Sequence, residues 1–206
     1  HMARLLMERK AQRVNALAVL ERMAAKTDWN DQEKVDELFR EIESFRTAVR
    51  MDLTLNRHVG KMAETDPKAV LAVWEDKNPW DDSPVLSEEA TPARKTRVSV
   101  WLYKNEYESA AVNLLNLTAE PLVVQLRVNP AERNALLLYE VIDVPRNDGS
   151  TVPDALAELN SAATITIPGG GARRLWTTVN GKRLDQDQRS CPLRYCLWVK
   201  TRSERR

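Results

Sequence analysis

The chain has 206 residues, of which 43% are hydrophobic and 30% charged, ordinary values for one large or two small globular domains. Its 31 basic and 30 acidic side chains leave a formal net charge of +1, so long-range attraction gives no reason to expect a nucleic acid or an anionic membrane as partner. No stretch approaches the roughly 18 consecutive apolar residues of a membrane span. His1-Met2 is typical of a cloning remnant. The sequence has no secretory signal, but the cloning remnant suggests that the natural N-terminus is missing. We therefore still expect a secreted or periplasmic location.

The first part of the chain is expected to form an antiparallel helical hairpin. From residue 5 to residue 25, apolar side chains recur at three- and four-residue steps. Asn30 as N-cap, with Glu33 three residues later, is a capping-box pattern that begins a second helix. This helix runs to about Asn56 or, with a bend, to Met62. The two apolar stripes are expected to pack on each other, and a coiled-coil or oligomer contact is the alternative.

A third, short helix is expected from Asp66-Pro67, because Asp suits a cap and Pro suits a first helical turn. It would carry Leu71 and Trp74. Residues 78–95 are rich in Pro, Ser and charge, which is typical of a linker. We therefore divide the chain into a helical region, residues 1–85, and a β region, residues 86–206.

The β region alternates short apolar segments with turns, a pattern that favours an immunoglobulin-like antiparallel β-sandwich of about seven strands. Residues 153–159 are expected to form a loop or a helical turn. The predicted fold class is α+β, with the helical hairpin and short helix followed by the sandwich. The expected strands are residues 96–103, 107–117, 121–128, 136–144, 163–167, 174–179 and 193–201.

Motifs for nucleophilic, phosphate or metal chemistry are missing from the sequence. His58 could act as a base, but a lone histidine near a helix end is more often a surface residue. Gly169-Gly170-Gly171 precedes a strand rather than a helix, so it is interpreted as a loop between strands. Cys191 and Cys196 are interpreted as buried thiols, since no further ligand stands near them. We assign no catalytic residue, no metal ligand and no cofactor.

Two carboxylate pairs are candidates for a glycosidase-like acid and base. Glu106 and Glu108 flank Tyr107, and Asp81 adjoins Asp82 in the linker. Such a pair needs two carboxyl groups about 5–10 Å apart across a cleft, with an apolar pocket that raises one pKa. Nothing in the sequence indicates such a pocket, and we interpret both pairs as solvated charges.

Aromatic side chains supply the candidate ligand site. Trp101 and Tyr103 are two residues apart, so they share one face of their strand, opposite the core-directed positions. With Tyr107 they could form a platform on which a sugar ring stacks. The alternative is that the helices or a neighbouring domain cover this face. Trp176 is interpreted as core or inter-domain packing.

Four segments resemble large bacterial multi-modular carbohydrate-active proteins, in which an immunoglobulin-like β-sandwich precedes a glycoside-hydrolase-like barrel. They are NPWDDSP at Asn78–Pro84, KNEYESAAVNLLNLTAEPLVVQLRV at Lys104–Val128, YEVIDVPRNDGSTVPDAL at Tyr139–Leu156 and RRLWTTVNGKRLD at Arg173–Asp185. The resemblance implies that Glu106, Asn113, Asn116 and Trp176 are framework positions. Residues 185–189 depart from it, because they lack the Asp-Pro-Gly-x-Tyr turn of such sandwiches. Asn116 also opens an N-glycosylation pattern, which would be idle in a bacterial protein.

Together these observations predict a non-catalytic accessory or structural module of a larger bacterial carbohydrate-active protein. The expected partners are neighbouring domains of the parent protein, with polysaccharide as the candidate ligand and neither nucleic acid nor membrane. A carbohydrate-binding module, an enzyme fragment that shares its site with a missing barrel, and a helix-mediated interaction domain are the alternatives. Fold alone does not decide among them.

Overall fold

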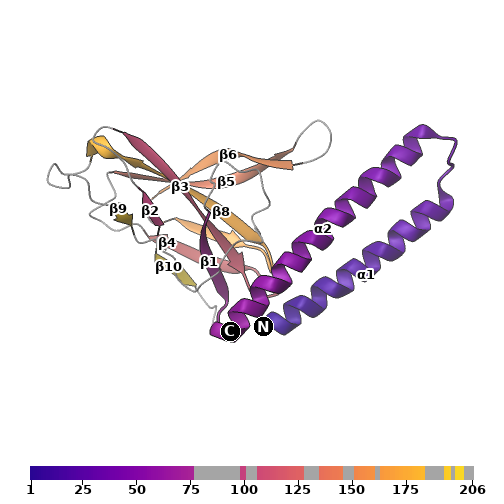
Figure 1. The fold of residues 1–206 in the computed structure, drawn as a ribbon, viewed down its shortest axis with the longest axis horizontal. Helices are drawn as coiled ribbons and strands as arrows, with labels where there is room; N and C mark the ends of the chain where they lie inside the picture. The colour runs from indigo at the N-terminus through magenta and orange to yellow at the C-terminus, as the bar shows by residue number, and fades with distance from the viewer. Residues whose placement is uncertain are drawn as a thin grey trace.

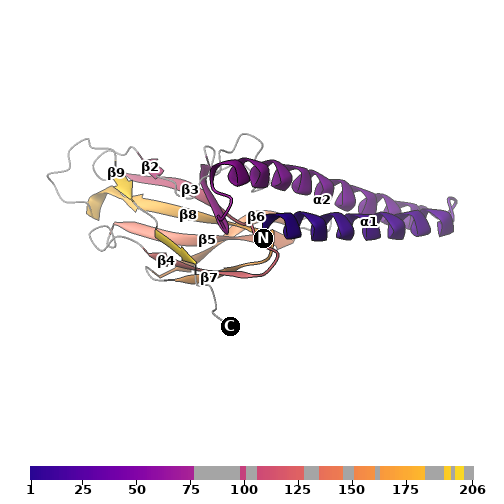
Figure 2. The same cartoon turned by 90° about the horizontal axis from the view of Figure 1, so that it is seen from below.

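The computed structural model describes residues 1–76, 98–100, 106–127, 135–145, 151–160, 163–183, 193–195 and 198–201. Two helices precede antiparallel β-sheets, so the chain is an α+β protein (Figure 1). The helices leave the sheets at one end and extend as a long arm, and the N-terminus lies at the base of this arm (Figure 2). The expected boundary near residue 85 lies outside the described residues.

Helices α1 (Met2–Lys26) and α2 (Gln32–Thr65) lie side by side and run in opposite directions, as the apolar stripes predicted (Figure 1). An ion pair from Arg13 Nε to Asp52 Oδ2, 2.6 Å long, fixes which turns of the two helices meet. The expected N-cap at Asn30 is wrong by one residue. Asp31 caps α2 by accepting a hydrogen bond from the backbone N–H of Lys34, and hydrogen bonding to Lys34 lowers the pKa of the Asp31 carboxyl.

The expected third helix is wrong, because strand β1 (Leu71–Asp76) occupies that segment. Asp66 ends α2 instead of starting a helix: its N–H donates to Met62 O, and Pro67 follows directly. Residues 71–74 are buried without a break, so the run has no strand-like alternation. A short, continuously apolar run fits a buried helix as well as a strand covered on both faces, and periodicity cannot separate the two.

Among the described residues every strand pairing is antiparallel, and these strands form three sheets. Their orders are β1-β3-β8-β5-β6, β10-β4-β7 and β2-β9. A short 3-10 turn, η2 (Gly181–Arg183), follows β8. The remaining strands are β2 (Val98–Val100), β3 (Tyr107–Asn116), β4 (Leu122–Arg127), β5 (Leu136–Pro145), β6 (Thr151–Leu159), β7 (Thr164–Ile167), β8 (Ala172–Asn180), β9 (Leu193–Tyr195) and β10 (Trp198–Thr201).

Two strand predictions need correction. Residues 153–159, expected as a loop or helical turn, belong to β6 (Thr151–Leu159) at the edge of the five-stranded sheet. An edge strand tolerates Pro153 because one row of its backbone groups is outside the ladder. Residues 193–201, expected as one strand, are divided between β9 and β10, which belong to different sheets. The described residues therefore form ten strands rather than about seven.

The main core lies between the five-stranded and three-stranded sheets, which face each other (Figure 2). Alternate residues of each strand point into it, because side chains alternate across a pleated strand. On β3 these are the even-numbered positions, so the odd-numbered ones lie on the opposite side, here called the outer face. The inward side chains include Leu71, Val73, Val112, Leu114, Val124, Leu126, Leu138, Ile165, Ile167 and Leu175.

A second hydrophobic cluster joins the base of the arm to the outer face. Helix α1 contributes Met2 and Leu5, α2 contributes Leu55, Val59 and Met62, and the sheet side contributes Ala72, Trp74, Leu115 and Leu117. Apolar side chains from helices and strands thus fill one continuous interior. We call this cluster together with its surrounding polar contacts the joint.

Replacing Met62 with Ala should show how strongly the joint stabilises the fold. Met62 is 1% exposed, so the truncation leaves a cavity and should lower the free energy of unfolding by about 2–5 kcal/mol. Met51, on the same helix and 42% exposed, is the matched control, and Met51→Ala should change it by less than about 0.5 kcal/mol. Urea denaturation followed by circular dichroism measures both, and equal effects would contradict a shared interior.

Candidate functional site

The predicted sugar platform is described at one of its three positions. Tyr107, at the start of β3, is 57% exposed, and its hydroxyl accepts a hydrogen bond from Asn180 Nδ2 at 3.2 Å. Trp101 and Tyr103 lie outside the described residues. An exposed ring held by one polar contact can receive the apolar side of a sugar.

The described carboxylates near this position are exposed, as expected. Glu106 and Glu108 both reach solvent, and the Glu108 carboxylate accepts a hydrogen bond from the N–H of Ser109. Asp81, Asp82 and the two cysteines lie outside the described residues. Within the described part of the chain, no cluster of three or more His, Cys, Asp or Glu side chains could hold a metal ion, and no helix is long and apolar enough to cross a membrane.

The glycine loop between β7 and β8 is the surface against which α1 packs. Gly170 adopts a φ of 60° and donates its N–H to Thr118 O at 2.9 Å. A Cβ on Gly170 would lie 2.6 Å from Leu5 Cδ1 of α1, and one on Gly169 would lie 1.9 Å from Ala119 O. Arg9 of α1 donates to Gly169 O at 3.1 Å. The glycines thus provide both the left-handed backbone and the close approach of the helix.

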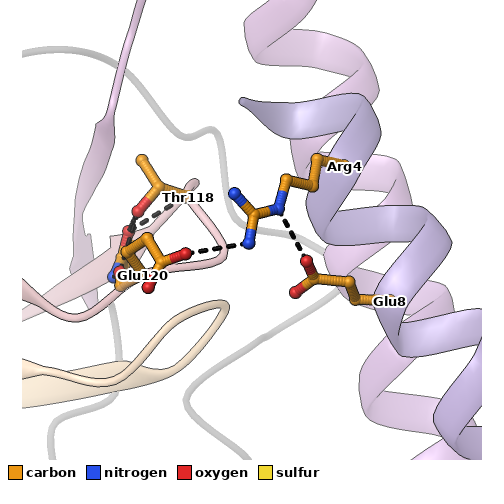
Figure 3. Close-up of polar contacts among 5 residues, drawn as sticks. Arg4, Glu8, Thr118 and Glu120 are labelled. Atoms are coloured by element: carbon orange, nitrogen blue, oxygen red, sulfur yellow. Dashed lines mark hydrogen bonds and ion pairs between the residues drawn. The ribbon is translucent and has the colours of Figure 1, made fainter.

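Arg4 forms the outer polar contact of the joint (Figure 3). Its guanidinium donates from Nε to Glu8 at 2.7 Å and from Nη2 to Glu120 at 2.9 Å, and thereby links α1 to the turn after β3. The hydrogen bond to Glu8 and the charges of Glu8 and Glu120 raise the pKa of Arg4. The group is exposed, so it contributes orientation more than stability.

Asn116 holds together the two turns on which α1 packs. Its side-chain amide lies within hydrogen-bonding distance of three carbonyl oxygens, those of Glu120 at 2.8 Å and of Ile167 and Pro168 at 3.1 Å. Its Oδ1 accepts from the N–H and the hydroxyl of Thr118. Asn116 is fully buried, so its glycosylation pattern is inaccessible in the folded chain, and the residue is structural.

A buried ion pair lies on the outer face beside the joint. Arg174 Nη2 is 2.9 Å from Asp76 Oδ2, and both side chains are nearly buried. Asn113 bridges them: its amide donates to Asp76 at 3.2 Å and its Oδ1 accepts from Arg174 at 3.3 Å. The charges neutralise each other across β1, β3 and β8, and this arrangement fixes the relative positions of the three strands. Removing one partner would leave a buried charge unpaired and lower the free energy of unfolding.

The polar contacts continue along the outer face toward Tyr107. Trp176, 7% exposed, packs on this face rather than between the two sheets, and its Nε1 donates to Thr178 Oγ1 at 3.2 Å. The Thr178 hydroxyl also lies 3.1 Å from that of Ser109. Trp176 is therefore a packing residue, as expected, and Tyr107 is the ring with the greater access to solvent.

The expectation of a surface histidine is wrong. His58 is 0% exposed, and its ring centroid lies 5.3 Å from that of Trp74. It is buried because α2 runs unbroken past residue 58, so that this turn lies against β1 instead of fraying. His58 belongs to the joint and is not a base open to a substrate.

Comparisons with known proteins add no identity: neither a scan against protein-family models nor a search of curated proteins found a match. The site must therefore be interpreted from its own geometry. That geometry concentrates the polar contacts at the joint and along the outer face.

Sequence reasoning missed the partners of Arg174 and Gly170. The positions of Asp76 and Arg174 become meaningful only when β1 is known to pair with β3 and β3 with β8. The triple glycine was a visible signal, but a helix 160 residues away in sequence packs against it. Asn116 carried a usable signal, since Asn favours turns and bonds to nearby backbone.

Asn116→Ala should destabilise the protein by about 2–4 kcal/mol, because it leaves several buried carbonyl oxygens and the Thr118 N–H without their partner. Asn56, exposed on α2, is the control; Asn56→Ala should be neutral or slightly stabilising, since Ala is the better helix former. Thermal unfolding measures both changes. Equal melting temperatures for the two variants would refute the structural role of Asn116.

Proposed function

We propose that this chain is a non-catalytic accessory or structural module of a larger bacterial carbohydrate-active protein, with the helical hairpin as a rigidly mounted arm. The joint is the observation that carries the proposal. The described polar residues of the joint and the outer face form hydrogen bonds and ion pairs that hold helices, strands and turns in place. The resemblance of four segments to such multi-modular proteins supplies the wider setting.

The joint resists movement of the arm in three ways. Apolar side chains of both helices are interleaved with β1 and β3. Arg4 and Arg9 contact two different turns of the β region. Helix α2 also passes into edge strand β1 through a turn of only a few residues. A hinge needs residues that can absorb a change in backbone angles, and here the turn from α2 to β1 is held by hydrogen bonds from the N–H of Asp66 to Met62 O and from the N–H of Ala69 to Asp66 O.

We further propose that the β region is an immunoglobulin-like sandwich. Two antiparallel sheets face each other across the main core, and the chain crosses between them from β3 to β4 and from β7 to β8. Such crossings are a feature of sandwich folds that share this architecture without sharing every connection. This fold commonly acts as a spacer or docking surface, which agrees with an accessory role.

The rigidity of the arm can be tested by the distance between spin labels at Asn30, in the turn at the tip, and Thr166 on β7, after Cys191 and Cys196 are replaced by Ser. A mounted arm gives one narrow distance distribution. Gly170→Ala should broaden it, because the added Cβ meets Leu5 and the φ is positive. Gly60→Ala is the control, since nothing lies within 4 Å of its Cβ. A broad distribution in the unsubstituted chain would remove the proposal.

A carbohydrate-binding module is the second candidate, favoured by the exposed ring of Tyr107. Affinity gel electrophoresis against a panel of soluble polysaccharides tests it. Retardation should be lost in Tyr107→Ala and kept in Tyr107→Phe, because stacking needs the ring rather than the hydroxyl. Retardation that survives Tyr107→Ala, or none at all, excludes this ring as a platform. Hydrolysis of a glycoside by the isolated chain would contradict the non-catalytic proposal.

A further inference from the structure

One side of the arm carries a stripe of exposed apolar side chains. Met7 and Leu53 stand two residues from Leu5 and Leu55, which are buried at the joint, so they point away from the sheets. Val14 is seven residues after Met7, Leu17 is three further, and Phe39 is fourteen before Leu53; each spacing keeps the helix face. All five side chains are exposed. We call this stripe the outer hairpin face.

The arm has little interior of its own. Between residues 6 and 53, Leu38 alone among the apolar side chains is fully buried. The ion pair of Arg13 and Asp52 stands between the helices where a coiled coil would place apolar residues. Helix pairs obtain most of their stability from apolar packing. A bundle of four helices encloses an apolar core that two helices alone cannot enclose.

Charge is distributed unequally along the arm. Its base, residues 2–15 and 50–65, carries seven basic and three acidic side chains, a net charge of +4. Its tip, residues 16–49, carries five basic and eight acidic side chains, a net charge of −3. Two such arms laid side by side in opposite directions would place each acidic tip against a basic base. In the parallel arrangement like charges would meet.

From these observations we propose that the outer hairpin face is the interface of an antiparallel homodimer, in which two arms form a four-helix bundle around a two-fold axis. Leu17 and Val14 lie near the axis, and Phe39 of each copy lies opposite Met7 of the other. The 25 residues of α1 span about 38 Å, and two helices abreast are about 20 Å wide. The face therefore offers roughly 750 Å² per copy, close to the ~800 Å² of a standard interface. The proposal goes beyond the accessory role and does not depend on it.

Sedimentation equilibrium of the full chain tests the interface. The unsubstituted chain should have twice the 23.5 kDa mass of the monomer. Leu17→Glu places a charge near the axis and should raise the dimer dissociation constant at least tenfold. Val19→Glu is a close control, because Val19 is 45% exposed against 46% for Leu17 and lies on the opposite side of the same helix. A monomeric unsubstituted chain, or equal weakening by both variants, overturns the proposal.

Charge reversal tests the antiparallel arrangement. Asp36→Lys with Glu43→Lys changes the net charge of the tip from −3 to +1, and Lys10→Glu with Arg50→Glu and Lys61→Glu changes that of the base from +4 to −2. Each set alone should weaken the dimer about tenfold, and all five substitutions in one chain should restore it, since tip and base then carry opposite charges again. In a parallel dimer each set would reduce the repulsion between like charges and tighten binding, so unchanged or tighter binding by either set alone would overturn the antiparallel proposal. The spin-label distance of the arm reports separately on the joint when labelled chain is diluted into an excess of unlabelled chain, so that each dimer holds one labelled copy.

Discussion

The placement of the arm depends on one close contact, the approach of α1 to the glycine loop between β7 and β8. No side chain fits at Gly169 or Gly170 without meeting backbone or the helix itself. Glycine is costly in a loop, because the unfolded chain loses more freedom there on folding. Here the two glycines let α1 approach closely, so that Leu5 packs in the second cluster and Arg9 reaches a loop carbonyl. Asn116 holds the same loop from the other side through hydrogen bonds to Ile167 O and Pro168 O.

This contact explains why a helical segment and a sheet share one interior. Helix α2 ends at Thr65 and β1 begins at Leu71, so the edge strand has little freedom once the hairpin is in place. In return, β1 supplies Trp74 and Ala72 to the cluster that holds the hairpin. The ion pair between Asp76 and Arg174 then fixes the far end of β1 across two neighbouring strands. The arm and the sheet edge therefore stabilise each other.

The sequence predicts a helix or strand well where its hydrophobic residues follow a regular period, and poorly where they do not. The hairpin and most strands obey a period, so their existence was predictable even though the N-cap was misplaced by one residue. Segments 71–76 and 151–159 obey none: the first is buried on both faces and the second contains Pro153 and helix-forming residues. Tertiary pairing decided both, and propensity is a weak guide where packing dominates. The candidate site was harder still, since Asp76 and Arg174 meet only through the register of three strands, and His58 is buried because the last turns of α2 lie against β1.

The sequence of the arm must both specify one register between its helices and supply apolar side chains for packing, and these two requirements conflict. Arg13 and Asp52 between its helices specify which turns meet, and such a polar pair favours one register at the expense of apolar burial. Strong apolar packing is then confined to the base, where the sheets cover the helices. Beyond the base, the apolar side chains lie on the outside, in a stripe that no described part of the chain covers. Within the tip, Leu38 is the one apolar side chain that is fully buried among the described residues, so a surface laid on the stripe would add burial that the hairpin alone lacks. The arm is therefore well fixed at its base and weakly packed along its length. Such an arm is suited to burying its exposed stripe against a complementary apolar surface.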